Sequence, residues 1–298
     1  MEQGNFAEAT RFFKDGLAIA DRLANSNPRY PLWQSDLARS YSRIGDALTV
    51  QGHLAEALAS YRESLAIMEQ LTDADPNDVA FQRELFFGYT KVGSALAGLR
   101  NYAEALIYHR KGQAIAERAA KADPSHARWQ HSLGSTHEAI GDTLRAQGDL
   151  AGALKSYELA CDLVSRLGKA DPNNTNWQRD LAGCYYRIGD MLAAQGKLAG
   201  ALESYRESLA IAGRLTQTAP DNAEWQRLLA ISHGKVALVL AKQGDAAHAL
   251  NELRKGRAIV ARLNELLPDV VLFPDDLARF DAEIARLERA GASTADPK

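Results

Sequence analysis

One spacing dominates this sequence. An aromatic residue recurs every 48 residues, and a glutamine follows each member of the series: Trp33, Phe81, Trp129, Trp177 and Trp225. All four tryptophans of the chain lie in this series, and Phe273 extends it with Pro274 in place of the glutamine. Prolines keep the same step: Pro28, Pro76, Pro124, Pro172, Pro220 and Pro268. Such strict self-similarity is the signature of a repeat architecture.

Each repeat predicts two amphipathic helices. In the first one, apolar residues fall three or four positions apart: Leu37, Tyr41, Ile44 and Leu48. Gly52 ends this helix in the way a left-handed C-terminal glycine does. A second stripe runs from Leu54 to Met68, and Pro76 stops it. No segment alternates with period two, so we expect no sheet and an all-α fold.

Small residues recur inside the first helices. Four repeats share one position: Gly45, Gly93, Gly141 and Gly189. Glycine inside a helix costs about 1 kcal/mol relative to alanine. Its repetition predicts that two helix backbones approach closely there, with the alanine series that begins at Ala9 and Ala57 as the counterpart on the second helix.

The segment 41–61, YSRIGDALTVQGHLAEALASY, resembles the tetratricopeptide repeat: aromatic, apolar-Gly, apolar, Gly, Ala, aromatic. The resemblance covers roughly 5–290, as five full units, a second helix at the start and a first helix at the end. The family unit has about 34 residues. Here about seven are added to each helix, which keeps the stripe facing the core. The chain is similar to the long-repeat arrays of kinesin light chains and of bacterial regulatory proteins.

The resemblance implies a right-handed α-solenoid of antiparallel helix hairpins. One helix, five pairs and one further helix predict about twelve helices. We expect a single solenoid over residues 1–290 and a disordered tail at 291–298. The predicted boundaries are a half unit 1–28, units 29–76, 77–124, 125–172, 173–220 and 221–268, and a polar capping helix 273–290.

In this family the first helix of each pair lines a concave groove that binds peptides. The groove positions lie six and three residues before the helix glycine, and one and four after it. They vary between repeats of this chain, whereas the core positions hardly change. The resulting candidates are Arg39, Ser42, Asp46, Phe87, Thr90, Glu138, Asp142, Arg145, Tyr186, Asp190, Ile231 and Leu238.

The candidates suggest the chemistry of a partner. Carboxylates in the early and middle units and apolar residues in the last predict a ligand with a basic stretch and an apolar end. In the alternative interpretation, Asp46 and Asp190 pair with Arg43 and Arg187, three residues earlier on the same helix. The lysine and asparagine clamp of chaperone-binding relatives is missing, so we expect no binding of an acidic chaperone tail.

Several functional classes are disfavoured. A net charge of −3 with both signs interspersed argues against nucleic acid. No apolar run reaches the roughly 18 residues of a membrane span. Cys161 and Cys184 form no disulfide or metal pattern and indicate a reducing compartment, the cytoplasm. His109, His137 and His233 replace tyrosines of other repeats, so we expect packing roles, no metal, no cofactor and no enzymatic activity.

Two interpretations of function remain. The first is a protein-interaction scaffold that binds a peptide or partner segment in the groove. The alternative is a regulatory or sensor module, part of a larger bacterial signalling protein, that binds a small ligand or peptide to control a catalytic domain. The first helix of the chain lacks a hairpin partner and carries Phe12 where other units have serine. We therefore expect that this helix belongs to a longer array or mediates homodimerisation.

Overall fold

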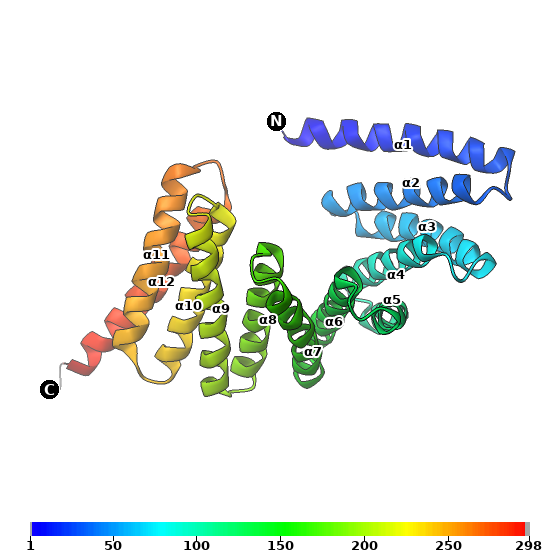
Figure 1. Ribbon diagram of the computed structural model, residues 1–298. Coiled ribbons are helices and arrows are strands. Elements are labelled where there is room, and N and C mark those ends of the chain that lie inside the picture. The colour runs from blue at the N-terminus through cyan, green and yellow to red at the C-terminus, as the bar shows by residue number, and fades with distance from the viewer. Residues whose placement is uncertain (1, 296–298) are drawn as a thin grey trace. The chain divides into compact units, whose positions relative to one another are not determined.

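The computed structural model describes residues 2–295, and the side chains of residues 12–290. This part of the chain forms twelve helices and no strand (Figure 1). It divides into two compact units, the first ending at Asp149 and the second beginning at Leu150. The prediction of an all-α helical-repeat solenoid with about twelve helices is confirmed.

Every helix packs against its neighbours in sequence within its own unit. Unit 1 contains α1 (Glu2–Ser26), α2 (Pro31–Val50), α3 (Leu54–Ala74), α4 (Val79–Gly98), α5 (Tyr102–Ala122) and α6 (Ala127–Gln147). Unit 2 contains α7 (Leu150–Ala170), α8 (Thr175–Ala194), α9 (Leu198–Thr218), α10 (Ala223–Lys242), α11 (Ala246–Leu266) and α12 (Leu272–Ala295). Even-numbered helices are the first helices of the repeats, and odd-numbered ones are the second helices.

The recurring Trp-Gln pair joins consecutive helices. Asn222 caps α10 by accepting a hydrogen bond from the Trp225 amide at 3.0 Å. The next residue, Gln226, donates from Nε2 to the Pro220 carbonyl at 3.0 Å. Gln34 reaches back in the same way to the Ala24 carbonyl, at 3.2 Å. The glutamine thus satisfies carbonyls that the preceding helix end leaves without a partner.

The turn inside each hairpin requires a left-handed residue. Gly52 has φ +79° and Gly196 has φ +74°, values that glycine adopts without steric cost. Arg100 fills the same place in the α4–α5 turn with φ 63°. The predicted left-handed end at Gly52 is confirmed.

The glycines inside the first helices allow an aromatic ring to approach. A Cβ on Gly189 would lie 2.6 Å from the Tyr205 ring, and one on Gly93 would lie 2.7 Å from His109. Gly45 is equally close to the ring of Tyr61. The predicted close approach of two helix backbones is therefore replaced by the approach of a side chain. The approaching group is the ring four residues after the recurring alanine, because a planar ring fills the space that a missing Cβ leaves.

Helix boundaries follow the predicted repeats with small shifts. First helices start up to two residues before the aromatic residue, and α12 extends to Ala295, beyond the predicted end of the capping helix at 290. Of the predicted tail, residues 296–298 lie outside the described residues. Continuity of one array across the division between the units remains a prediction.

Candidate functional site

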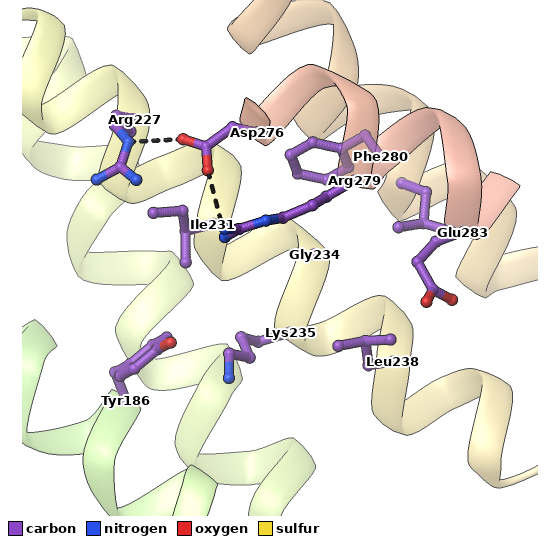
Figure 2. Close-up of a pocket in the computed structure, with 11 residues that line it drawn as sticks. Tyr186, Arg227, Ile231, Gly234, Lys235, Leu238, Asp276, Arg279, Phe280 and Glu283 are labelled. Atoms are coloured by element: carbon purple, nitrogen blue, oxygen red, sulfur yellow. Dashed lines mark hydrogen bonds and ion pairs between the residues drawn. The ribbon is translucent and has the colours of Figure 1, made fainter. Parts of the chain in front are cut away.

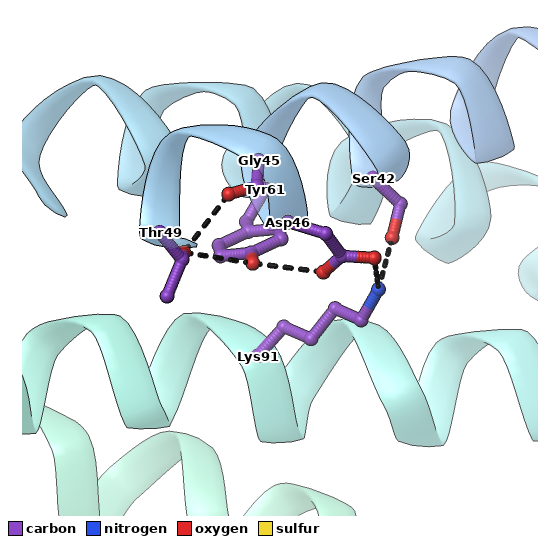
Figure 3. Close-up of polar contacts among 6 residues, drawn as sticks. All are labelled: Ser42, Gly45, Asp46, Thr49, Tyr61 and Lys91. Atoms are coloured by element: carbon purple, nitrogen blue, oxygen red, sulfur yellow. Dashed lines mark hydrogen bonds and ion pairs between the residues drawn. The ribbon is translucent and has the colours of Figure 1, made fainter. Parts of the chain in front are cut away.

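In unit 1, the predicted groove residue Asp46 belongs to a polar cluster that joins three helices (Figure 3). Its Oδ1 accepts a hydrogen bond from the Tyr61 hydroxyl of α3 at 2.9 Å. Its Oδ2 accepts one from Lys91 Nζ of α4 at 2.8 Å. Lys91 also donates to Ser42 Oγ at 2.7 Å, and Tyr61 shares a contact of 3.0 Å with Thr49. Asp46 is therefore already engaged within the protein.

This cluster revises the expected ion pair. The cation that binds Asp46 comes from the next first helix and is not Arg43 of the same helix. Burial raises the pKa of Tyr61 to about 12, and its hydrogen bond to the Asp46 carboxylate adds to the rise. Tyr61 consequently stays protonated and acts as a hydrogen-bond donor.

Unit 2 contains the same cluster 144 residues later, where Asp190 lies between Tyr205 and Lys235. The Tyr205 hydroxyl donates to Asp190 Oδ1 at 2.5 Å, and Lys235 Nζ donates to the same oxygen at 2.7 Å. Lys235 Nζ lies 4.8 Å from the centroid of the Tyr186 ring, close enough for a cation–π contact. Burial lowers the pKa of Lys235, but its contacts with Asp190 and Tyr186 outweigh that effect and raise it.

The other predicted groove residues of unit 1 make local contacts. Arg39 pairs with Asp36 at 2.6 Å, and Arg145 lies 3.7 Å from Asp142. Thr90 donates to a backbone carbonyl of its own helix at 3.0 Å. Phe87 is exposed beside another ring, and Glu138 is half-buried.

In unit 2, predicted groove residues converge on a cavity of about 420 Å³ (Figure 2). Tyr186 of α8 and Ile231 and Leu238 of α10 line it together with residues that were not predicted. The complete lining is Tyr186, Arg227, Ile231, Gly234, Lys235, Leu238, Leu253, Asp276, Arg279, Phe280 and Glu283. Three first helices and α11 therefore build one hollow with an apolar floor and a charged rim.

The buried carboxylate of Asp276 organises the rim. Arg227 Nε donates to its Oδ2 at 2.7 Å, and Arg279 Nη1 lies 3.8 Å from its Oδ1. Phe280 closes the floor, because a Cβ on Gly234 would meet its ring at 3.3 Å and one on Gly256 at 2.6 Å. The two glycines thus make room for this ring.

A second, smaller hollow of about 180 Å³ adjoins the first. The two share Lys235 and Leu238, and the smaller one also contains Asp190 and Tyr205. The predicted groove residues Tyr186, Asp190, Ile231 and Leu238 therefore lie along one hollowed surface of unit 2. Leu238 is 37% exposed and is accessible from solvent.

The contribution of α12 was missed because this helix was interpreted as a polar cap. A signal was present in the sequence, since Arg279 lies six residues before Ala285, which takes the place of the helix glycine. The spacing of the groove positions from the helix glycine (the groove rule), applied to the last helix, would have selected Arg279.

His109 shows what happens where the cluster is incomplete. It takes the place of Tyr61 in the next repeat, whereas Ser94 takes the place of Asp46. His109 is buried, and its Nδ1 has no hydrogen-bond partner among the described residues. Burial lowers its pKa to about 4, against a smaller opposing effect of Asp142. His109 is therefore neutral at physiological pH.

Within residues 12–290, no group of three or more His, Cys, Asp or Glu residues is arranged to hold a metal ion. Among the described helices, none combines the length and the apolar character that crossing a membrane requires.

Comparisons with known proteins agree with this architecture. The tetratricopeptide-repeat family model matches residues 37–78 and 181–218. The crystal structure of BtubC (BKLC) from P. vanneervenii superposes with a TM-score of 0.67 at 16% identity, covering 87% of this chain and 92% of that protein. Among curated protein sequences, none matches this chain significantly.

Two further structures share the fold. The apo form of RapI has a TM-score of 0.63 at 14% identity, over 86% of this chain and 63% of RapI, so the chain spans less than two thirds of that protein. The nearly identical TPR-like repeats from Podosopora anserina have a TM-score of 0.50 at 17% identity, over 77% of this chain and 97% of theirs. The chain is a helical-repeat protein, and two of its segments match the tetratricopeptide repeat.

Proposed function

We propose that this chain is a protein-interaction scaffold whose unit 2 binds a peptide or a segment of a partner protein. The observation that carries the proposal is the 420 Å³ hollow built by successive first helices, with Tyr186, Ile231 and Leu238 on its surface. Concave, mostly apolar sites with a few polar groups are the usual form of binding pockets. An apolar side chain of the partner would fill the floor, while Arg279 and Glu283 would contact its polar groups.

The predicted partner had a basic stretch and an apolar end. The apolar floor of the hollow in unit 2 supports the apolar end. The basic stretch stays part of the proposal, although Asp46 and Asp190 each already accept a hydrogen bond from a lysine of the chain. The groove surface of unit 1, with Phe87 exposed, is a further proposed contact.

Selection from a displayed random-peptide library tests this proposal. Peptides selected on the wild-type chain should bind the Leu238→Asp variant at least about tenfold more weakly, since a charge would be placed on the apolar floor. Leu159→Asp is the matched control, because Leu159 is 42% exposed, close to the 37% of Leu238, and lies on α7 away from the hollow. If no peptide is selected, or if both variants bind equally, the proposed site is wrong.

The alternative function is a regulatory module that senses a small ligand. The hollow of about 420 Å³ falls within the range of roughly 300–1,000 Å³ that small-molecule sites occupy. A ligand that binds only the folded state raises the unfolding temperature. A thermal-shift screen in which metabolites stabilise the chain, and Leu238→Asp removes the effect, would favour this alternative over the scaffold.

The remaining parts of the proposal are a non-enzymatic role, a cytoplasmic location and self-association. Cys161 and Cys184 are buried and form no disulfide with each other, which supports a reducing compartment. Self-association would use α1, whose Ile19 and Leu23 are exposed apolar side chains.

A further inference from the structure

The terminal helix α1 exposes side chains whose counterparts in α9 are buried. Ile19 is 53% exposed and Leu23 is 40% exposed. Four repeat steps later, Ile211 and Leu215 of α9 occupy the same positions and are buried. They form a cluster with Ala182 of α8, the first helix of their own hairpin. The open face of α1 is thus the one that a first helix normally covers.

The last helix, α12, shows the reverse situation. It is a first helix, and its position 278 corresponds to Ala182 and Ala230, which are both buried. Ala278 itself is exposed. Ala285 is exposed as well, although Ala237 at the same position of α10 is fully buried. The open face of α12 is therefore the one that a second helix normally covers.

These two faces are complementary halves of one repeated interface. We propose that the chain associates head to tail, with α12 of one copy packed on α1 of a second copy. Ala278 would meet Ile19 and Leu23 in the way that Ala182 meets Ile211 and Leu215. The inference rests on the proposed self-association through α1 and specifies the surface that covers this helix. The contact would continue the interface already formed by α8 and α9.

The charged residues of α12 do not oppose this contact. Asp281 pairs with Arg257, and Glu288 accepts a hydrogen bond from Arg254 at 2.9 Å, so both carboxylates are held by α11. The small side chain of Ala278 allows close approach of a second helix, as that of Ala182 does.

A head-to-tail contact joins two different surfaces. Such an interface leaves one free face of each kind on every dimer, so association continues into open chains or rings. The mass of the wild-type chain should therefore rise with concentration past that of a dimer.

The test uses two single substitutions at exposed positions of the full chain. Ile19→Asp removes the α1 face and keeps α12, while Ala278→Arg removes the α12 face and keeps α1. Ile107→Asp and Ala59→Arg are matched controls, since Ile107 is 57% exposed and Ala59 is exposed on α3. Sedimentation velocity measures the mass, and circular dichroism confirms that each variant remains folded.

We expect each single variant to be a monomer and an equimolar mixture of the two to form a dimer that grows no further. Both controls should assemble like the wild type. A wild-type chain that stays monomeric at high concentration overturns the inference, and so does an Ala278→Arg variant that still dimerises alone, which would indicate a symmetric α1 pair. Peptide binding at Leu238 is measured separately, so failure of the proposed function would not be mistaken for failure of this contact.

Discussion

The two polar clusters of the molecule share an aspartate, a tyrosine and a lysine and differ in two neighbours, because Ala193 takes the place of Thr49 and Tyr186 that of Ser42. In unit 1, Asp46 binds Tyr61 and Lys91, and Ser42 accepts a second hydrogen bond from that lysine. In unit 2, the position of Ser42 is taken by Tyr186, whose ring lies beside Lys235. The Asp46 side chain is 51% exposed, whereas that of Asp190 is 31% exposed.

The difference teaches how a repeat protein gives equivalent positions different surroundings. The glycine, the ring and the acid–lysine pair of the first cluster recur in the second. A tyrosine in place of serine at a groove position adds an aromatic ring beside the lysine, and the aspartate there is less exposed. The same ring also lines the hollow of unit 2. Variation on a constant frame therefore distinguishes a more solvated surface from a hollowed one.

The largest expected effect concerns the contact between glycine and tyrosine ring that both clusters share. Gly189→Val and Gly45→Val should each destabilise the chain by about 3 kcal/mol, because the new side chain collides with the ring of Tyr205 or Tyr61. Urea unfolding measures the loss. Gly213→Val is the control, since a Cβ at Gly213 has no neighbour within 4 Å. Unequal costs at Gly45 and Gly189 would show that the two clusters do not share one frame.

The next effect should separate the clusters. Asp190→Ala is expected to cost about 2 kcal/mol, because it removes the acceptor of two hydrogen bonds in a half-buried site. Asp46→Ala should cost less than about 1 kcal/mol, as more exposed ion pairs do. Tyr61 keeps Thr49 as a partner, and Lys91 keeps Ser42. Equal losses in urea unfolding would contradict the importance given to Tyr186.

Alkaline pH should distinguish the two tyrosines. Burial raises the pKa of Tyr61 from 10.0 to about 12, and the pKa of Tyr205 is raised further. The folded state then holds protons that the unfolded state releases, so this stability is present below pH 10 and is lost as the pH rises through the folded pKa values. Tyr205→Phe should flatten the loss between about pH 9 and about pH 11 at least as much as Tyr61→Phe. A steeper loss in either variant would contradict the sign.

The smallest effect at neutral pH concerns the incomplete cluster. The pKa of His109 is about 4 in the folded state, against 6.5 ordinarily, so the unfolded state binds more protons between these values. Stability should fall as the pH decreases from 6.5 towards 4, and His109→Phe should reduce that fall. His248→Gln, at an exposed histidine, is the control. Identical pH profiles for wild type and His109→Phe would contradict the burial of a neutral imidazole.

The fold could be predicted from the sequence because each repeat contains residues that mark the ends of its helices. The aromatic and proline series located the helices within a few residues, and Gly52 marked a turn that requires a positive φ. Close approach at Gly45 was also predictable, since repeated glycine inside a helix needs a reason. The identity of the approaching group was not, because Tyr61 and Ala57 lie on the same helix and only packing decides which one reaches the glycine.

The candidate site was less accessible to sequence analysis. In the alternative interpretation Asp46 pairs within its own helix, but Lys91, 45 residues away, reaches it because α3 packs on both α2 and α4. The groove rule selected Tyr186, Ile231 and Leu238, and these three residues line one hollow. The rule missed Asp276 and Phe280 of α12. Asp276 is buried and Phe280 packs its ring on neighbouring helices, and both features arise only from contacts in the folded protein.

The most direct test of the scaffold proposal compares equivalent positions in the two units. A photo-reactive benzoylphenylalanine is placed at position 238 or at position 94, which share one place in the repeat. A peptide selected on the wild-type chain should crosslink efficiently from position 238 and only at background level from position 94. Equal crosslinking from both, or crosslinking from position 94 alone, would contradict the assignment of binding to the hollow of unit 2.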